Sequence, residues 1–258
     1  MLAEAIGRDR TDLAVSPETG IPPPAARRFG EMVRRRLRRE PVAYILGRRG
    51  FRHIELAVDP RVLIPRPETE LLVELALELQ PRRVLDVGTG SGAIALAIAA
   101  ELPECEVVAT DTSPAALEVA RANAERLGLA ARVEFVEAAL PAEGAFDLVV
   151  ANLPYVSEAE WAGLEPEVTE WEPREALLAG PDGLDAFRAL LVDRVRLLSS
   201  LVRQRANATP GTVALEVGAG QAEAVGALMV EARFDSIETR GDLAGIERVV
   251  IGRQGVAR

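Results

Sequence analysis

The sequence has little or nothing of several features, and each absence excludes a class of protein. A single cysteine, Cys105, excludes an internal disulfide and a metal site built from cysteines alone, and we expect it to be a small buried residue. The chain has no run of roughly 18 apolar residues and no apolar signal region, which predicts a cytoplasmic protein that does not enter a membrane. Aromatic residues make up 4% of a chain that is 48% hydrophobic, so the core must be mostly aliphatic.

Lysine is also absent, so all 30 basic residues are arginines, set against 40 acidic residues and a net charge of −10. This balance argues against stable binding of nucleic acid, because phosphate contacts need clustered cations. The arginines nevertheless crowd the segment 27–39. The segment is either a solvated helix face or a surface that meets ribosomal RNA or an acidic partner.

From residue 83 onward, short apolar runs alternate with helical patterns, which predicts an α/β fold with a doubly wound, mostly parallel sheet. The last two predicted strands have only a short connection, so they should pair antiparallel. The predicted strands are 83–87, 106–110, 133–136, 146–150, 212–217, 236–240 and 248–252, and the predicted helices are 93–100, 114–127, 184–201 and 221–232.

The part of the chain before this alternation divides into two regions. Residues 1–40 predict a short helical domain, in which the run Ile21 to Pro24 interrupts any helix and a second helix covers 25–39. Residues 41–67 have short β-like runs and predict a hairpin-like linker. The main domain, 68–258, then opens with an amphipathic helix over 68–79.

A glycine-rich loop follows the first strand of the main domain, with the sequence Asp86-Val87-Gly88-Thr89-Gly90-Ser91-Gly92-Ala93. Such a loop lets a ligand approach the backbone and the amino end of the next helix closely. The spacing also fits the dinucleotide fingerprint, so the loop alone does not identify its ligand. We expect the cofactor to be bound here by Asp86, Gly88, Thr89, Gly90, Ser91, Gly92 and Asp111.

Two acidic residues help to identify the class of cofactor. Asp86 ends the strand beneath the loop, where its carboxylate would repel a diphosphate but attract the ammonium group of a methionine moiety. This favours S-adenosylmethionine over a nicotinamide dinucleotide. Asp111 ends the second strand, where both kinds of cofactor need an acceptor for ribose hydroxyl groups, so it indicates a nucleoside without choosing between them.

The predicted reaction centre is Asn152-Leu153-Pro154-Tyr155, which follows the fourth strand. In an open α/β sheet the first and fourth strands flank the point where strand order reverses, so Asn152 should face the glycine loop. The Asn152 side-chain oxygen and the Leu153 carbonyl can hold both N–H groups of a poorly nucleophilic amide or amine and direct its lone pair toward a methyl group. Pro154 stiffens the turn and Tyr155 offers a flat face, so no metal, nucleophilic serine or nucleophilic cysteine is needed.

Other residues receive simpler interpretations. His53, the only histidine, is interpreted as a surface or turn residue, and Glu216 as a structural residue at the end of the fifth strand. Trp161 and Trp171 are expected to pack a lid over the site. Arg66 and Glu68, which lie beside prolines, either line the cofactor pocket or form a structural hinge.

Motifs distributed over nearly the whole chain resemble the PrmC/HemK family, which methylates the glutamine amide of peptide chain release factors. The segment Ile64-Pro65-Arg66-Pro67-Glu68-Thr69-Glu70 is the most distinctive of them. The motifs that carry the resemblance are Glu40 to Gly47, Pro60 to Glu70, Asp86 to Ala93, Asn152 to Tyr155, Glu172 to Leu177, Gly180 to Leu184 and Leu243 to Arg248.

The resemblance implies a class I S-adenosylmethionine-dependent methyltransferase domain, behind a small helical N-terminal domain that helps to dock the release factor. The acceptor would be the glutamine of the Gly-Gly-Gln loop, methylated on its side-chain nitrogen. By family correspondence Gly88 to Gly92 and Asp111 bind the cofactor, and Asn152 touches both cofactor and substrate. Leu153, Pro154 and Tyr155 complete the substrate site.

Three departures from the family pattern keep alternatives open. The family usually has proline where this chain has Leu153, and the form Asn-Leu-Pro-Tyr also occurs in rRNA adenine dimethyltransferases. Ala139 stands where the family often has an acid near the adenine, and the N-terminal domain is shorter than usual by roughly one helical hairpin. The alternatives are an adenine-N6 methyltransferase acting on nucleic acid and a catalytically inactive methyltransferase-fold scaffold.

Overall fold

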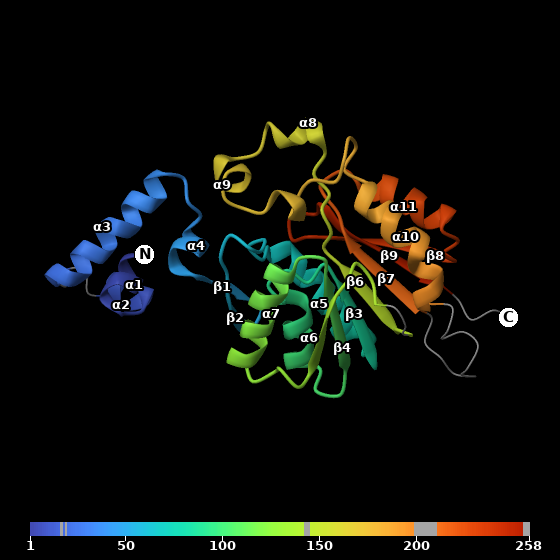
Figure 1. Cartoon of the computed structure of the whole chain (residues 1–258), viewed down its shortest axis with the longest axis horizontal. Helices are drawn as coiled ribbons and strands as arrows, with labels where there is room; N and C mark the ends of the chain where they lie inside the picture. Colours follow the sequence, from blue (N-terminus) through green and yellow to red (C-terminus); the bar gives the residue numbers. More distant parts are fainter. Residues whose placement is uncertain (16–17, 19, 142–144, 199–210, 255–258) are drawn as a thin grey trace.

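The computed structural model describes residues 1–15, 18, 20–141, 145–198 and 211–254, and its centre is a seven-stranded sheet (Figure 1). The strand order is β5-β4-β3-β6-β7-β9-β8, and all neighbours are parallel except that β9 runs antiparallel to β7 and β8. The predicted α/β fold and the antiparallel final pair are therefore confirmed. The strands are β3 (Arg83–Val87), β4 (Glu106–Asp111), β5 (Val133–Glu137), β6 (Leu148–Ala151), β7 (Gly211–Glu216), β8 (Ser236–Gly241) and β9 (Glu247–Gln254).

Helices cover both faces of this sheet (Figure 1). One face packs against α5 (Glu70–Leu79), α6 (Ala93–Glu101) and α7 (Pro114–Arg126), and the other against α10 (Asp185–Leu198) and α11 (Ala222–Glu231). The central strands β3, β6 and β7 are buried along nearly their whole length because helices cover both faces of the sheet there. Helix α10 lies where a helix over 184–201 is predicted, and the end of that prediction falls outside the described residues.

The chain order reverses between β3 and β6, and this reversal creates the site. From β3 the chain builds outward through β4 and β5, and it then returns to place β6 on the other side of β3. The connections after β3 and β6 therefore leave the sheet in different directions, which opens a crevice between them. The register pairs Val87 with Ala151, so the glycine loop and Asn152 begin next to each other at the same edge.

The first part of the chain forms four helices and a hairpin: α1 (Leu2–Ile6), α2 (Arg10–Val15), α3 (Pro23–Leu37), α4 (Val42–Leu46), β1 (Arg48–Phe51) and β2 (Ile54–Ala57). The proline run separates α2 from α3, as predicted, but Pro23 and Pro24 belong to the first turn of α3 instead of preceding it. Proline fits there because the first-turn N–H groups have no partner within the helix.

The hairpin β1–β2 packs into the core of the main domain, with Phe51 and Leu56 buried alongside α5 and α6. The buried side chain of Asn123, on α7, accepts from the N–H of Ala57 at 2.7 Å and donates to the carbonyls of Ala57 and Ser91 at 3.0 and 2.9 Å. One amide thus connects the linker to the glycine loop.

Four short helices, η1 (Pro67–Thr69), α8 (Glu158–Trp161), α9 (Pro166–Thr169) and η2 (Arg174–Ala176), border the open edge of the sheet. The segment after Asn152 is joined to the segment after η2 by backbone hydrogen bonds from the Val156 N–H to the Leu177 carbonyl and from the Ala179 N–H to the Val156 carbonyl. No helix in the described part of the chain is long and apolar enough to cross a membrane.

Candidate active site

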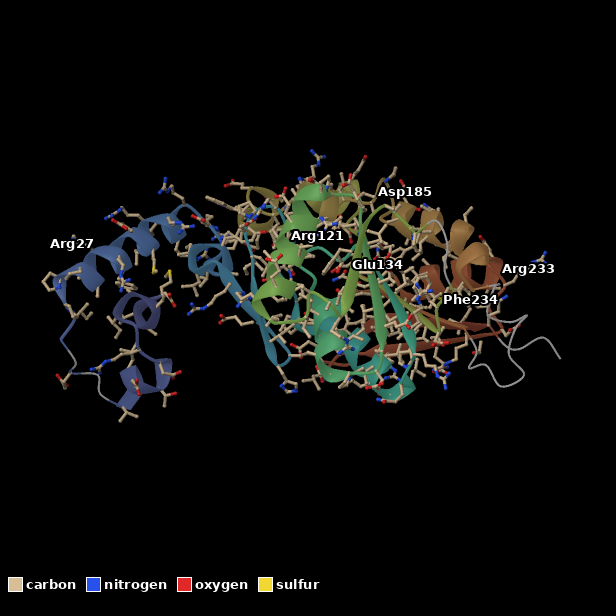
Figure 2. The ribbon with its side chains drawn as sticks, turned by 60° about the horizontal axis from the view of Figure 1, so that its bottom comes forward. Arg27, Arg121, Glu134, Asp185, Arg233 and Phe234 are labelled. Atoms are coloured by element: carbon tan, nitrogen blue, oxygen red, sulfur yellow. The ribbon has the colours of Figure 1, made fainter. Side chains whose placement is uncertain are left out.

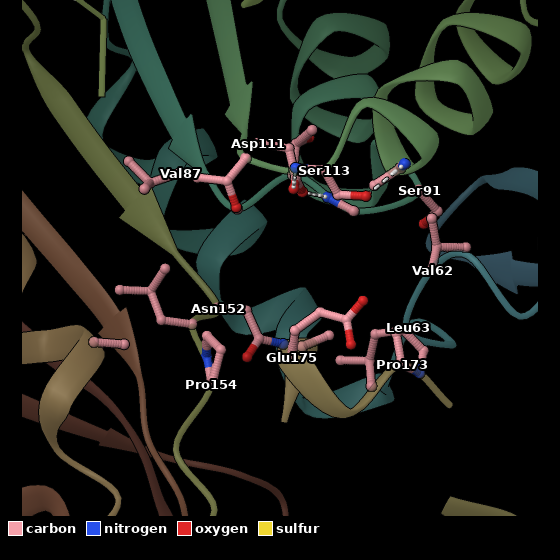
Figure 3. Close-up of a pocket in the computed structure, with 18 of the residues that line it drawn as sticks. Val62, Leu63, Val87, Ser91, Asp111, Ser113, Asn152, Pro154, Pro173 and Glu175 are labelled. Carbon is pink, nitrogen blue, oxygen red and sulfur yellow. Dashed lines mark hydrogen bonds between the residues drawn. The ribbon is translucent and has the colours of Figure 1, made fainter. Parts of the chain in front are cut away.

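A cavity of about 340 Å³ lies at the carboxyl ends of β3, β4 and β6 (Figure 3). This volume is within the range typical of small-molecule and cofactor sites. Its walls come from the linker, η1, the glycine loop with the start of α6, the ends of β4 and β5, the segment after β6, η2 and α10. The residues that line it include Val62, Leu63, Thr69, Gly88, Asp111, Ala139, Asn152, Leu153, Pro154, Glu175 and Leu190.

The glycine loop is held against β4 by backbone hydrogen bonds. The N–H groups of Gly88 and Thr89 both donate to the Thr110 carbonyl at 2.9 Å. Gly88 has φ +72°, and a Cβ there would lie 3.3 Å from the Leu153 side chain. Gly92 has φ +83°, and its Cβ would lie only 2.8 Å from the side chain of Leu96. The loop therefore needs glycine for both its backbone conformation and its close packing.

Asp86 supports this loop from beneath. The residue is completely buried, and its Oδ2 accepts from the Thr89 hydroxyl at 2.7 Å and from the Ala95 N–H at 3.1 Å. Burial raises the pKa of Asp86 to about 7. Asp86 is not among the residues that line the cavity. A direct contact between Asp86 and a cofactor stays a prediction, and the carboxyl group holds the loop in place.

Asp111 lies at the mouth of the glycine loop and does line the cavity (Figure 3). Its Oδ2 accepts from the Gly90 N–H and its Oδ1 from the Ser113 N–H, each at 2.9 Å. These bonds fix the carboxylate at the edge of the cavity, beside the end of β4, where the sequence predicts a ribose acceptor.

Asn152 follows the last residue of β6 and lies across the cavity from Asp111 (Figure 3). Its Nδ2 donates to the Thr69 Oγ1 at 3.1 Å, which leaves its Oδ1 available as an acceptor. Leu153 and Pro154 also line the cavity, and the side chain of Leu153 packs on Gly88. The structure thus brings the predicted reaction centre and the predicted glycine loop together in one cavity.

Tyr155 occupies a different position from its neighbours. It is half-buried, packs against the core formed with α10 and α11, and is not among the residues that line this cavity. Its carbonyl accepts from the Gln221 Nε2 at 2.9 Å, and burial raises the pKa of its hydroxyl to about 12. The stacking of its ring on an acceptor stays a prediction.

Several cavity residues were not predicted from the sequence. Val62, Leu63 and Pro65 reach the cavity from the linker, Thr69 from η1, and Glu175 from η2. Three apolar residues, Ala186, Ala189 and Leu190, come from α10. Their spacing of three and four residues marks one face of a helix, which is the only sequence signal they carry.

Arg66 and Glu68 do not line this cavity. Arg66 forms an ion pair with Glu172, and the other oxygen of Glu172 accepts from the Ile64 N–H at 3.0 Å. Glu172 is almost completely buried, so this pair connects the linker firmly to the segment before η2. Of the two interpretations given for Arg66, the structural hinge agrees with these contacts.

The arginine-rich segment is only partly available to a partner. Arg36 and Arg39 form ion pairs with Glu167 of α9 at 2.5 and 2.6 Å, and Arg35 pairs with Glu40 at 2.5 Å. Arg27, by contrast, lies at the end of α3 that is farthest from the sheet (Figure 2). Two of the seven arginines of this segment, Arg36 and Arg39, thus attach the end of α3 to the border of the active site.

His53 and Cys105 agree with their sequence interpretations, whereas the packing of Trp161 and Trp171 as a lid over the site stays a prediction. His53 is exposed in the turn between β1 and β2, and Cys105 is buried. The Trp161 ring stacks under the Arg174 guanidinium at 5.2 Å, and Trp171 packs on the main core. Within the described ranges no group of histidine, cysteine, aspartate and glutamate is placed to hold a metal.

The site combines a glycine loop after β3, an acid at the end of β4 and an Asn-Leu-Pro-Tyr segment after β6. Together with the reversed strand order and the antiparallel last strand, these features define a class I S-adenosylmethionine-dependent methyltransferase. Comparison with known families agrees, since residues 84–171 match the family described as a methyltransferase domain and residues 1–47 match the PrmC N-terminal domain. A solved methyltransferase from Pyrococcus furiosus shares the fold with a TM-score of 0.55 at 20% identity, over 78% of this chain and 89% of that chain.

Curated relatives cover nearly the whole chain. A release factor glutamine methyltransferase from Geobacter sulfurreducens is 41% identical over 99% of this chain and 88% of its own length. A protein of the same name from Bordetella pertussis is 44% identical over 96% of this chain and 91% of its own length. The chain belongs to the release factor glutamine methyltransferase family, the PrmC/HemK family.

Proposed function

We propose that this protein transfers a methyl group from S-adenosylmethionine to the side-chain amide nitrogen of the glutamine in the Gly-Gly-Gln loop of a peptide chain release factor, in the cytoplasm. Membership of the family supports the reaction and its substrate. The observation that carries the proposal is the position of Asn152, which lines the same cavity as the glycine loop and whose Nδ2 is taken up by Thr69.

The residues of the cavity fit S-adenosylmethionine. The backbone of Gly88 to Gly92 would hold the methionine part, and Asp111 would accept from the ribose hydroxyls. Ala138, Ala139 and Leu140 form an apolar wall suited to a flat adenine ring, and a side chain at Gly90 would meet no atom within 4 Å, so the loop is open on that side. When bound, the cofactor supplies a methyl group activated by the positive charge of its sulfur.

The protein must then hold an amide nitrogen in a reactive orientation. An amide nitrogen is a weak nucleophile because its lone pair is delocalised into the carbonyl group. We propose that the Asn152 Oδ1 and the Leu153 carbonyl each accept one N–H of the glutamine amide, which directs the lone pair toward the methyl group and stabilises the positive charge that develops. The methylated nitrogen is acidic and loses its proton without a strong base, so the centre needs none.

Leu153 stands where the family usually has proline, and this change leaves the proposed role of the position intact. The role assigned to this position belongs to its backbone carbonyl, which leucine retains. The Leu153 side chain packs on Gly88, a contact that stiffens the turn in place of the missing ring. Pro154 follows at once and restricts the backbone on the other side.

We also propose that residues 1–40 form a helical docking domain, that 41–67 are its linker, and that 68–258 carry the chemistry. The match of residues 1–47 to the PrmC N-terminal domain supports a separate first domain. The ion pairs of Arg36 and Arg39 with Glu167 support a defined orientation of this domain beside the active site. A release factor bound to both parts would present its loop at the cavity.

The test uses labelled S-adenosylmethionine with three acceptors: a release factor, the same factor with Gly-Gly-Ala in its loop, and RNA. We expect label on the release factor alone, together with no stable binding of RNA. Label on RNA would favour the adenine methyltransferase, and equal label on the Gly-Gly-Ala factor would contradict the glutamine acceptor. Cofactor binding without any transfer would favour the inactive scaffold.

A further inference from the structure

Glu216 is a buried acid that the proposed reaction does not use. It is the last residue of β7, it is completely buried, and neither of its carboxyl oxygens has a hydrogen-bond partner of good geometry in the described part of the chain. A buried carboxyl group without partners costs folding free energy, so its presence calls for a role. The pairing of Leu215 with Ala151 places Glu216 level with Asn152 on the neighbouring strand.

Thr69 connects the two residues. It is 3% exposed, and its Oγ1 accepts from the Asn152 Nδ2 at 3.1 Å. The same side chain lies close enough to the carboxyl group of Glu216 to lower its pKa, although the two groups do not meet the geometry of a full hydrogen bond. A hydroxyl has one proton to donate, and the contact with Asn152 does not use it. That proton can therefore go to Glu216.

We propose that Glu216, acting through Thr69, is a positioning residue that fixes which way the side-chain amide of Asn152 points. A carboxylate can only accept hydrogen bonds, so Thr69 must donate to it and accept from the Asn152 Nδ2. The Asn152 Oδ1 then faces the cavity as an acceptor. With the amide reversed, an NH₂ group would face the cavity and repel a substrate that brings N–H groups.

This inference rests on the proposed function and extends it to substrate selection. The oxygen of Asn152 favours acceptor nitrogens that still carry hydrogens, such as a primary amide, and disfavours groups that can only accept hydrogen bonds. The positioning residue belongs to a strand that does not line the cavity, so it acts entirely through Thr69.

The charged groups around Glu216 give the arrangement a pH dependence. Burial, with a smaller contribution from Glu68, raises the pKa of Glu216 to about 7 against the opposing effects of Thr69, Arg248 and Arg66. Tyr155 also faces this carboxyl group. A protonated carboxyl can either donate or accept, so it no longer fixes the orientation of Asn152. Turnover should therefore fall as the pH decreases through about 7.

The kinetic test compares Thr69→Val, Thr69→Ser and Glu216→Gln in the full chain, with a release factor and saturating S-adenosylmethionine. We expect Thr69→Val to lower kcat by about 10- to 100-fold, with cofactor affinity within about twofold, and Thr69→Ser to remain within about threefold of the wild type. Glu216→Gln should lower kcat at pH 8 by about tenfold, and its turnover should no longer fall as the pH decreases through about 7. An unchanged kcat in Thr69→Val, or an unchanged pH step in Glu216→Gln, would overturn the inference.

A second measurement does not depend on activity. The side-chain amide resonance of Asn152, assigned by its loss in Asn152→Ala, should shift between pH 6 and pH 8 in the wild type and in Thr69→Ser. It should not shift in Thr69→Val or Glu216→Gln, and a shift in all four proteins would contradict the inference. Absence of methyl transfer by the wild type, with the expected resonance pattern, would count against the proposed function and leave the positioning role supported.

Discussion

The two sides of the active-site cavity are held in place in different ways. The glycine loop is fixed mainly by residues that lie close in sequence or on the adjacent strand: Asp86 binds Thr89 and Ala95, and Thr110 binds Gly88 and Thr89, while Asn123 of α7 adds one bond to Ser91. The Asn152 segment is fixed by distant residues, since Thr69 lies 83 positions away and Gln221 lies 66 positions from Tyr155. The cofactor side is thus a local structure, whereas the acceptor side depends on the assembled fold.

This difference predicts which measurements each substitution affects. Changes on the acceptor side should lower turnover and leave cofactor affinity nearly constant. Changes in the glycine loop region should weaken cofactor binding and have less effect on turnover at saturation.

Asn152→Ala should have the largest effect. It removes the acceptor that holds the substrate nitrogen, so we expect kcat to fall by roughly 10³-fold or more, with little change in cofactor affinity. Single-turnover transfer to a release factor and calorimetric binding of S-adenosylmethionine check the two parts separately. A large loss of cofactor affinity with kcat intact would reverse the assignment of the two sides.

Gly183→Ala should disturb the acceptor side without touching the cavity. Gly183 has φ +74°, and a Cβ there would lie 2.4 Å from the Tyr155 carbonyl oxygen and 2.8 Å from the Gln221 Nε2. The clash displaces the segment that carries Asn152, so we expect kcat to fall about 100-fold. Gly226→Ala on α11 is the matched control, because its Cβ would meet only Ile237 at 3.8 Å. Equal kcat values for the two variants would show that the segment tolerates displacement.

Asp111→Asn should weaken cofactor binding by about tenfold. The amide nitrogen replaces one of the two oxygens that accept from Gly90 and Ser113, and the amide accepts hydrogen bonds from ribose hydroxyls less well than the carboxylate does. Turnover at saturating cofactor should change by less than about threefold. Glu137→Gln is the control, since Glu137 pairs with Asp111 on β5 but does not line the cavity. A fall in kcat at saturation that exceeds the fall in affinity would contradict a role limited to the cofactor.

Asp86→Asn should have the smallest effect on activity but a clear effect on stability. Burial raises the pKa of Asp86 from 3.8 to about 7, so the native state favours the protonated acid. The associated stability is fully present below about pH 4 and is lost as the pH rises through about 7. As the pH rises, the free energy of unfolding of the wild type should therefore fall by roughly 2–4 kcal/mol more than that of Asp86→Asn. Denaturant unfolding without cofactor at several pH values measures this, and identical slopes would contradict a protonated Asp86.

The same contrast explains how much the sequence could predict. The strands, the glycine loop and the antiparallel last pair carry local patterns of apolar residues, glycines and connection length, and the structure agrees with all of them. Asn152 could be placed opposite the loop because the order of strands in such sheets follows general rules. Thr69 and Glu216 could not be joined to it, because their contact depends on the packing of η1 against the ends of β6 and β7, for which no local pattern exists.

The linker illustrates the same limit. Its hairpin was predicted from alternating residues, but its contribution of Val62 and Leu63 to the cavity wall was not. That contribution depends on the buried Glu172, which lies more than 100 residues further along the chain and holds Ile64 and Arg66. A charged residue inside a loop gives no sequence signal that distinguishes a buried anchor from a solvated side chain.

The position of β9 between β7 and β8 has a consequence for the order of folding. Among the described residues β8 pairs with β9 alone, so it cannot join the sheet before β9 does. The two strands are close in sequence and form a hairpin from local contacts, which is fast compared with the closure of the long parallel crossovers. We therefore expect the hairpin to dock onto β7 as a preformed unit. Because Val249 pairs with Glu216, this docking step is also the one that removes water from the Glu216 carboxyl group.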